Sequence, residues 1–427
     1  MSATSKVLSI EQGILWNSVG SMVYLVCNWL TTVLVVVLGS DISGSGSLAV
    51  AMSVGNIYAT IVLLRARPVQ VSEAYPDLTT GHFIAQRVLA LVVATVFCLV
   101  YGLISVSPSD YLVVACYCLF KAADSFVDVL HGIDQINSRL DYAAISQVLR
   151  GLGLLVGFAA GLIVFKSLLV AILFMAIVSL AVILAFDFPV AASFGSVTPK
   201  FEKRQLFELC KICFPGFIAS LACTTVVSLT RQFYGLSYGN EQLGIYAAVA
   251  TPTAVVQALV TYLYAPILGP LAKSWQDNRI DLIVSMTKKV FIAVTAATVM
   301  CVLGGILLGK PVLTLIYGEQ IGSHSAYLPL MLVATALTGL MFFSIDLAIS
   351  FGKPVYGFIS SSFSLVVAVV LSKTLFSSAA FQYDANVISV VIVLAYGVGL
   401  VISGLLTVRL IKARCSVGRK FNNHMHP

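Results

Sequence analysis

Long apolar segments, each separated from the next by a short polar stretch, recur along the whole chain. A helix needs about 20 predominantly apolar residues to cross the hydrocarbon core of a bilayer. About twelve segments meet this length criterion, and each is predicted to be a transmembrane helix. They lie near residues 14–38, 47–66, 87–106, 111–133, 144–165, 167–187, 212–236, 243–268, 290–309, 326–350, 355–376 and 386–410. The first, eighth and tenth are long enough to be tilted or broken.

The composition supports a membrane protein. Of the 427 residues, 59% are hydrophobic and only 10% are charged, whereas soluble domains carry roughly 25% charged residues. A chain this apolar has too few polar residues to cover a water-exposed surface, and its connections leave no room for a soluble domain. The predicted fold class is therefore an all-α polytopic membrane protein.

Basic residues are unevenly distributed between the two sets of connections, which predicts the orientation of the chain. One set, with the carboxy-terminal tail, holds Arg65, Arg67, Arg87, Arg139, Lys200, Lys203, Arg204, Lys211, Lys273, Arg279, Lys288, Lys289, Lys353, Arg409, Lys412, Arg414, Arg419 and Lys420. The opposite set holds little more than Lys166, Lys310 and Lys373. Both termini are thus predicted to be cytoplasmic in a multi-pass protein of the cell membrane. This topology explains the net charge of +7, which does not indicate nucleic-acid binding.

The longest inner connection, near residues 188–211, divides the predicted helices into two sets of six. We expect an N-terminal six-helix lobe over residues 1–190, a cytoplasmic linker over 191–211, a C-terminal lobe over 212–412 and a cytoplasmic tail over 413–427. Two similar halves are common in membrane transporters.

Polar residues recur at three- and four-residue steps in the first two helices of each half. They are Asn17, Ser21, Tyr24, Asn28 and Thr31, then Ser53, Asn56 and Thr60, then Ser220, Thr224, Ser228 and Arg231, and finally Thr253, Gln257, Thr261 and Tyr264. This spacing places each set on one helix face. A polar face in hydrocarbon must meet protein or water, so four such faces predict a shared hydrated cavity. The alternative is helix–helix packing, in which Ser and Thr are common.

The fifth segment carries a different pattern. Gly153, Gly157 and Gly161 repeat every four residues without polar companions. Small residues at this spacing allow two membrane helices to approach closely, so we expect a packing face here and not a functional one.

The fourth segment carries Lys121, Asp124, Asp128 and His131 on one predicted face. Lys121 is placed to pair with Asp124 along the helix, and the sequence offers Asp128 no nearby partner except His131. Charges within a membrane segment are costly unless paired or hydrated, and they often mark function. Ion coupling and a structural ion pair both remain open for this group.

Four further charges are candidates for function. Arg65 and Arg67 end the second segment at the predicted cytoplasmic mouth, where they either anchor the helix or meet an anionic headgroup first. Arg231 either reaches the outer headgroups or faces the cavity, where its guanidinium would suit a phosphate. Asp346 is a lone acid in the tenth segment and could bind a coupling cation or pair with Lys353.

Signatures of enzymes are lacking in the sequence. Cys210 and Cys213 form a single C-x-x-C without a second pair or a nearby histidine, so no metal site is predicted. No catalytic constellation and no nucleotide-binding loop stand out. We therefore expect a non-enzyme without a cofactor.

Three segments carry a resemblance to a known family. They are "LWNSVGSMVYLVCNWLTTVLVVVLG", "ADSFVDVLHGIDQINSRLDYAAISQVLRGL" and "LGIYAAVATPTAVVQALVTYLYAPILGPLAK". With them the chain resembles Wzx-type oligosaccharide flippases, in the polysaccharide transporter branch of the multidrug/oligosaccharidyl-lipid/polysaccharide exporter superfamily. The resemblance extends over nearly the whole chain.

The resemblance implies two six-helix lobes around a central cavity and transport by alternating access. The implied cargo is a short oligosaccharide linked by diphosphate to undecaprenol, moved from the inner to the outer leaflet with its lipid tail in the membrane. The implied substrate-binding residues are Arg65, Arg67, Arg231, Asn17, Asn28 and Gln257, and the candidate ion-coupling residues are Lys121, Asp124, Asp128 and Asp346. A coupling cation, Na⁺ or H⁺, and other polysaccharide assembly proteins are possible partners. The alternatives are a cation-coupled multidrug or small-molecule antiporter on the same scaffold and a membrane-embedded glycan polymerase.

Overall fold

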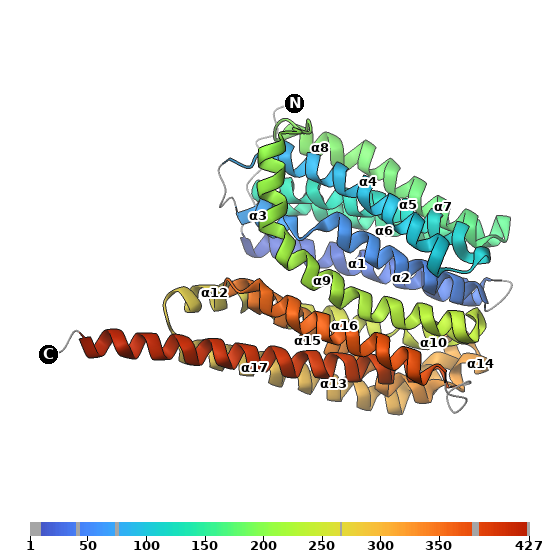
Figure 1. Ribbon diagram of the computed structural model, residues 1–427. Coiled ribbons are helices and arrows are strands. Elements are labelled where there is room, and N and C mark those ends of the chain that lie inside the picture. The colour runs from blue at the N-terminus through green and yellow to red at the C-terminus, as the bar shows by residue number, and fades with distance from the viewer. Residues whose placement is uncertain (1–9, 40–42, 73–76, 265–266, 378–383, 425–427) are drawn as a thin grey trace. The chain divides into compact units, whose positions relative to one another are not determined.

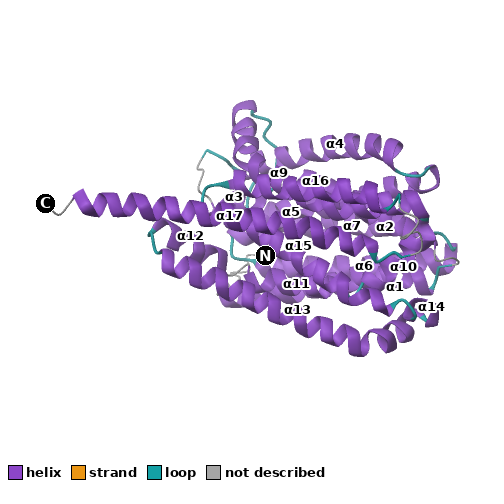
Figure 2. Cartoon of the chain, turned by 60° about the horizontal axis from the view of Figure 1, so that its bottom comes forward, coloured by secondary structure: helices purple, strands orange, loops and turns teal. Residues whose placement is uncertain are grey.

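All elements of the described part of the chain are helices (Figure 2). The computed structural model describes residues 10–39, 43–72, 77–264, 267–377 and 384–424. The helices, labelled in Figure 1, are α1 (Ile10–Val37), α2 (Ser43–Leu63), α3 (Ala66–Ser72), α4 (Thr80–Ser105), α5 (Pro108–Ile136), α6 (Leu140–Phe165), α7 (Leu168–Val182), the π-helix η1 (Ile183–Asp187), α8 (Phe188–Ser193), α9 (Lys203–Tyr238), α10 (Asn240–Ala250), α11 (Thr253–Tyr264), α12 (Leu268–Gln276), α13 (Ile280–Tyr317), α14 (Glu319–Gly322), the 3₁₀-helix η3 (Ser325–Tyr327), α15 (Leu328–Ser350), α16 (Pro354–Leu375) and α17 (Val387–His424).

Each of the twelve predicted membrane segments coincides with a helix or with a run of consecutive helices. Within the described residues, ten helices or runs are long and apolar enough to cross a membrane. The chain is therefore an all-α, multi-pass membrane protein, as its composition predicts.

The eighth segment, one of the three long enough to be tilted or broken, is broken into α10 and α11 around Pro252, which has no backbone N–H to continue the helix. By contrast, α1 and α15 are continuous, so the first and tenth segments are not broken. The helix α9 begins at Lys203, inside the predicted linker, and α17 continues to His424, past the predicted end of the C-terminal lobe (Figure 1).

Contacts within the chain group it into two compact units. Unit 1 comprises residues 1–217 and 235–251, and unit 2 comprises residues 218–234 and 252–427. The helix α10 packs against α2 and so belongs with unit 1, although it follows the first helix of the second half. The predicted lobe boundaries stay a prediction.

The glycine pattern of α6 forms a close helix contact in unit 1. A Cβ atom added at Gly153 would lie 2.5 Å from Cγ1 of Val178 on α7, and one added at Gly161 would overlap the backbone of Ala171. Contacts below about 3 Å are far inside the normal separation of carbon atoms. The predicted packing role of these glycines is confirmed.

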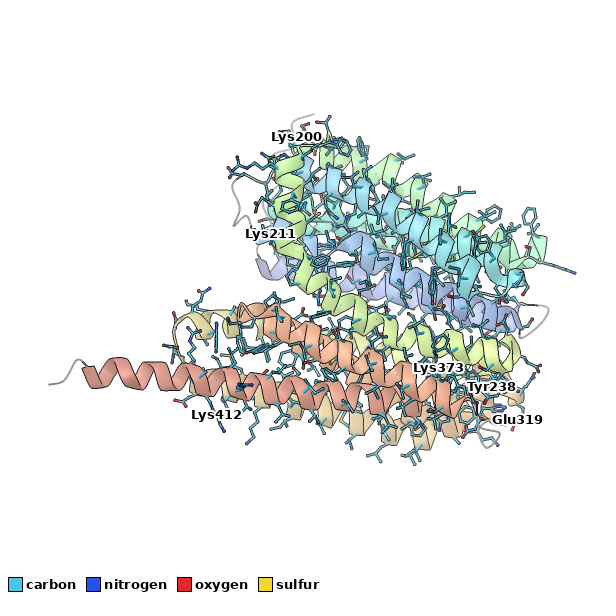
Figure 3. All side chains as sticks on the ribbon, viewed as in Figure 1. Lys200, Lys211, Tyr238, Glu319, Lys373 and Lys412 are labelled. Carbon is cyan, nitrogen blue, oxygen red and sulfur yellow. The ribbon has the colours of Figure 1, made fainter. Side chains whose placement is uncertain are left out.

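Unit 2 is built around α15, which packs against α11, α13 and α17, while α16 packs against α17. Figure 3 labels Lys373 and Glu319 at one end of these helices and Lys412 toward the carboxy-terminal end of α17. Lys310 forms an ion pair with Glu319 at 3.3 Å, and both side chains are more than half exposed.

Candidate functional site

A group of charged side chains surrounds Asp124 on α5 and is called the Asp124 cluster. The Lys121 ammonium lies 3.0 Å from one oxygen of Asp124, and the other oxygen accepts hydrogen bonds from Arg150 Nη1 at 2.8 Å and from the Tyr24 hydroxyl at 2.5 Å. The Arg150 guanidinium also lies 5.0 Å from the centre of the Tyr24 ring. The predicted pair of Lys121 with Asp124 is confirmed, and α1 and α6 supply the two other members.

A second group, the Asp128 cluster, lies one helical turn further along α5. Asp128 forms ion pairs with Arg67 of α3 at 2.9 Å and with Arg87 of α4 at 2.8 Å. Arg67 also donates to Gln135 at 3.2 Å, and Arg87 donates to the carbonyl of Val62 at 3.1 Å. This corrects the expectation that only His131 is available to Asp128. Two arginines reach Asp128 from elements distant in the sequence.

A sharp break in the backbone between α2 and α3 positions Arg67. Leu64 and Arg65 both adopt left-handed conformations, with φ of 47° and 55°, which non-glycine residues rarely occupy. The short α3 helix that follows is bonded to α5 at two points. Arg67 donates to Asp128, and Gln70 donates to the carbonyl of Val129 at 3.1 Å. Gln70 packs directly on Gly132, where a side chain would not fit.

The two clusters contain more positive than negative charge. Four basic side chains surround two carboxylates, which leaves a formal excess of two positive charges when all are ionised. Arg87 is fully buried and Arg150 nearly so, whereas the Arg67 and Lys121 side chains are 28% and 12% exposed. The excess positive charge is therefore accessible through Arg67 and Lys121. Such an arrangement favours an anion over a cation.

Several predicted cavity residues are engaged in helix contacts of unit 1. Ser21 donates to Gln147 of α6 at 2.8 Å, and Tyr24 donates to Asp124. Ser21 and Tyr24 therefore take part in helix–helix packing, which was the alternative to a hydrated cavity. Asn17 and Asn28 on the same helix are half-buried. Since a cavity shared by both halves would involve both units, it stays a prediction.

The remaining candidates are spread over both units. Arg65 and Arg231 are half-buried, and Gln257 is exposed. In unit 2, Asp346 accepts a hydrogen bond from the Tyr264 hydroxyl at 3.3 Å. The roles assigned to these four residues stay predictions.

Two arginines of the site were not among the residues predicted for it. Arg87 was expected in a cytoplasmic loop, although it is completely buried in α4. Arg150 lies six residues inside the predicted segment 144–165 and was not predicted to be functional. A charge inside an apolar segment is costly unless it is paired, and that rule was the available signal for Arg150.

A third buried carboxylate, Asp110 at the start of α5, joins three elements of unit 1. It accepts hydrogen bonds from Ser47 of α2 at 2.6 Å, from Ser107 at 2.7 Å and from Asn240 of α10 at 2.6 Å. Gly46 lies against the backbone of Asn240 without room for a side chain. Asp110 has neutral donors on both oxygens, and this arrangement suits a structural link between α2, α5 and α10.

Comparison with known proteins identifies the fold. No model of a protein family matches the sequence, and no curated protein matches it. Among solved structures, an inward-facing multidrug resistance MATE family transporter of the MOP superfamily matches with a TM-score of 0.74 at 12% identity, over 95% of this chain and 99% of that chain. An outward-facing MATE family transporter matches with a TM-score of 0.61 at 12% identity, over 94% and 95% of the two chains.

A third solved structure is a MOP superfamily transporter from Pyrococcus furiosus, described by the reverse polarity of its binding pocket and a suggested different function. It matches with a TM-score of 0.64 at 13% identity, over 94% of each chain. At these identities the comparison establishes the fold alone. This chain has an all-α fold similar to that of these MOP superfamily transporters.

Proposed function

We propose that this chain is an alternating-access transporter that moves a lipid with an anionic headgroup across the cell membrane. The proposed cargo is an oligosaccharide linked by diphosphate to undecaprenol, carried from the inner to the outer leaflet for surface polysaccharide assembly. One observation carries the proposal: the Asp124 and Asp128 clusters hold four basic side chains for two carboxylates.

The physical argument starts from the cost of moving charge through hydrocarbon. A diphosphate carries about two negative charges, and their transfer into an apolar medium without compensation is prohibitive. A transporter for such a lipid must therefore supply cations along the route. Arg67 and Lys121 are the partly exposed cations of the clusters, and a guanidinium can bind two phosphate oxygens at once.

The other candidates complete the proposed route. Arg65 would meet the headgroup at the cytoplasmic mouth, and Arg231 would receive it deeper in the membrane. Asn17, Asn28 and Gln257 would offer amide groups to the sugars. In this proposal both termini are cytoplasmic, and other polysaccharide assembly proteins supply and remove the cargo.

A second candidate is a cation-coupled multidrug antiporter on the same scaffold. The comparison favours it, because two of the similar structures are described as multidrug resistance transporters. The charges of unit 1 favour the first candidate, because Asp124 and Asp128 are each paired with two cations and offer little attraction to a cationic drug. The two candidates differ in the charge of the cargo, which an experiment can distinguish.

The test uses purified protein in liposomes that contain a fluorescent polyprenyl-diphosphate oligosaccharide, with a membrane-impermeant quencher to report translocation. Lys121→Gln should lower the rate at least about tenfold, a change that corresponds to 1.4 kcal/mol, while Asp124 keeps Arg150 as a partner. Lys373→Gln, at the opposite end of unit 2 from the carboxy terminus, is the matched control (Figure 3). Export of a cationic dye without movement of the lipid would establish the second candidate.

The deeper part of the route has its own test. Arg231→Ala should abolish lipid translocation, and Arg231→Lys should retain part of it, because lysine keeps the charge but loses the bidentate geometry. A wild-type rate for well-expressed Arg231→Ala would make Arg231 an anchor at the headgroups and would remove the deep cation from the proposed route.

A further inference from the structure

A third group of ionisable side chains in unit 1 has no part in the clusters described above. It consists of His131 and Asp134 on α5 and Asp187 at the end of η1. All three residues are buried, with 2%, 3% and 4% of their surface exposed. His131 Nε2 lies 3.2 Å from Oδ1 of Asp187, and Asp134 follows His131 on the same face of α5, since residues three apart are neighbours on a helix.

Both carboxyl groups have an oxygen without a donor. Among the described residues, Asp134 Oδ1 and Asp187 Oδ2 are buried atoms with no hydrogen-bond partner, and the Ser146 hydroxyl of α6 is another. Ser146 lies two helical turns before Gly153 on the face of α6 that packs against α7. A buried ionised oxygen without a donor is strongly unfavourable, whereas a protonated carboxyl group becomes a donor itself.

Both acidic and basic side chains surround the carboxyl groups of Asp134 and Asp187. Asp134 interacts electrostatically with Asp187 of η1, with Arg67 of α3, and with Asp141 and Arg139 at the start of α6. His131 and Asp187 both interact with Arg150 of α6, and His131 also with Arg67. Arg67 and Arg150 are already bonded to Asp128 and Asp124. Two buried carboxyl groups that interact electrostatically resist ionising together, because like charges repel.

A local irregularity of the helix carries Asp187. Pro189 in α8 has no backbone N–H and cannot bond to the carbonyl four residues earlier. The helix widens into the π-turn of η1 directly before it and resumes at Phe188. Single π-turns inside α-helices are frequently found at functional sites.

We propose that Asp134 and Asp187 form a buried proton-binding pair, which takes up one proton on a carboxylate oxygen and releases it during the transport cycle. His131 is the positioning residue that holds Asp187. A proton suits this group better than a metal ion, because no three His, Cys, Asp or Glu side chains of the described residues converge as metal ligands.

The consequence for transport rests on the proposed function. Arg67 belongs to the Asp128 cluster and also interacts with Asp134. A proton bound at the pair removes a negative charge beside Arg67 and strengthens its attraction for an anionic headgroup. Proton and headgroup therefore favour each other's binding, as linkage between two sites requires.

The first test needs no transport. Infrared difference spectra of the purified protein, recorded between alkaline and mildly acidic pH, should contain the C=O stretching band of a buried carboxylic acid. Asp134→Asn and Asp187→Asn should each remove or shift this band, and Asp134→Glu, which keeps a carboxyl group but moves it, should shift it. Asp141→Asn is the control, because Asp141 is paired with Arg139 at 2.8 Å near the same end of the helices.

Two results would overturn the proposal. One is a wild-type spectrum without the band, or a band unchanged in both Asn variants. The other is displacement of the band when Na⁺ replaces choline in the buffer, which would assign the pair to a metal cation.

The second test measures lipid translocation in liposomes against pH. The wild-type rate should change with pH, and the rate of Asp134→Asn should not, whereas His131→Gln should move the pH midpoint. If the infrared band behaves as expected but no lipid is moved, the proposed function fails and the proton pair stands. If lipid is moved at a rate independent of pH and the band is lacking, only the proton pair fails.

Discussion

The two units of this protein satisfy their buried polar groups in different ways. Unit 1 buries ionisable side chains, namely His82, Arg87, Asp110, His131, Asp134, Arg150 and Asp187. In the described part of unit 2 no Asp, Glu, Lys, Arg or His is fully buried, and its buried polar residues are mostly serine and threonine. Both units are helical and apolar, so the difference lies in chemistry and not in architecture.

The hydroxyl groups of unit 2 depend little on other helices. Ser360, Ser361 and Ser364 of α16 each donate to a backbone carbonyl four residues earlier on the same helix. Such bonds are available wherever a helix forms. Charged residues have no comparable partner on their own backbone, so those of unit 1 require partners from other helices. Ion pairs therefore tie the helices of unit 1 together, and a change in one charge affects several elements.

The largest effect should follow from Asp128→Asn. This change removes the charge partner of Arg87, which is fully buried, and of Arg67. Removing one member of a buried ion pair typically costs about 3–5 kcal/mol, because the other charge is left uncompensated. The measurement is thermal unfolding of the purified protein in detergent. An unchanged melting temperature would show that unit 1 does not depend on its ion pairs.

A smaller but clear loss of stability is expected for Gly161→Leu. The new side chain would overlap the backbone of Ala171 and force α6 and α7 apart, and overpacking typically costs about 1–3 kcal/mol. Gly404→Leu on α17 of unit 2 is the matched control, since an added Cβ there meets nothing within 4 Å. Equal melting temperatures of the two variants would contradict the close packing of α6 on α7.

Asn240→Ala tests the link between α10 and the rest of unit 1. It leaves Asp110 with the hydroxyl donors of Ser47 and Ser107. The loss of a donor to a buried carboxylate should cost about 1–3 kcal/mol. In the control Asn137→Ala, the lost side chain bonds to the carbonyl of Ile133 on its own helix. Faster hydrogen exchange of α10 in Asn240→Ala, and not in the control, would support the link.

The smallest effect is expected for Ser360→Ala in unit 2. The Ser360 hydroxyl bonds to the carbonyl of Tyr356, which already takes part in the helix. A typical hydrogen bond contributes about 0.5–1.5 kcal/mol net, and this change should fall at or below the lower value. A loss as large as that of Asp128→Asn would remove the distinction between the two units.

Features that depend on the spacing of residues along one segment were predictable from the sequence. The pair of Lys121 with Asp124 follows from a spacing of three residues, and the close approach at Gly153 and Gly161 follows from a repeat of four. Segment length allowed for the break in the eighth segment, but it did not distinguish this segment from the first and tenth, which are continuous helices. Each of these features depends on residues that are neighbours along the chain.

Partners from distant helices were not predictable in this way. Arg67, Arg87 and Arg150 reach the carboxylates of α5 from positions 61, 41 and 26 residues away in the sequence. Nothing in the local pattern distinguishes Arg87, which is buried, from the arginines of the connections. Asp187 was passed over for the same reason, because its relation to His131 exists only after α7 and η1 pack against α5.

The sequence by itself determined that this protein is a helical membrane protein. Its roughly twelve apolar segments must bury their backbone N–H and C=O groups in hydrocarbon, and a helix provides hydrogen-bond partners for these groups within each segment. It also determined that charges lie within the fourth segment. Only the tertiary structure decided how these charges are paired, which of them are partly exposed, and that two carboxyl groups each keep one buried oxygen without a donor among the described residues. The reason is physical: hydrophobicity and helix period are local properties of the chain, whereas the partner of a buried charge is chosen by helix packing.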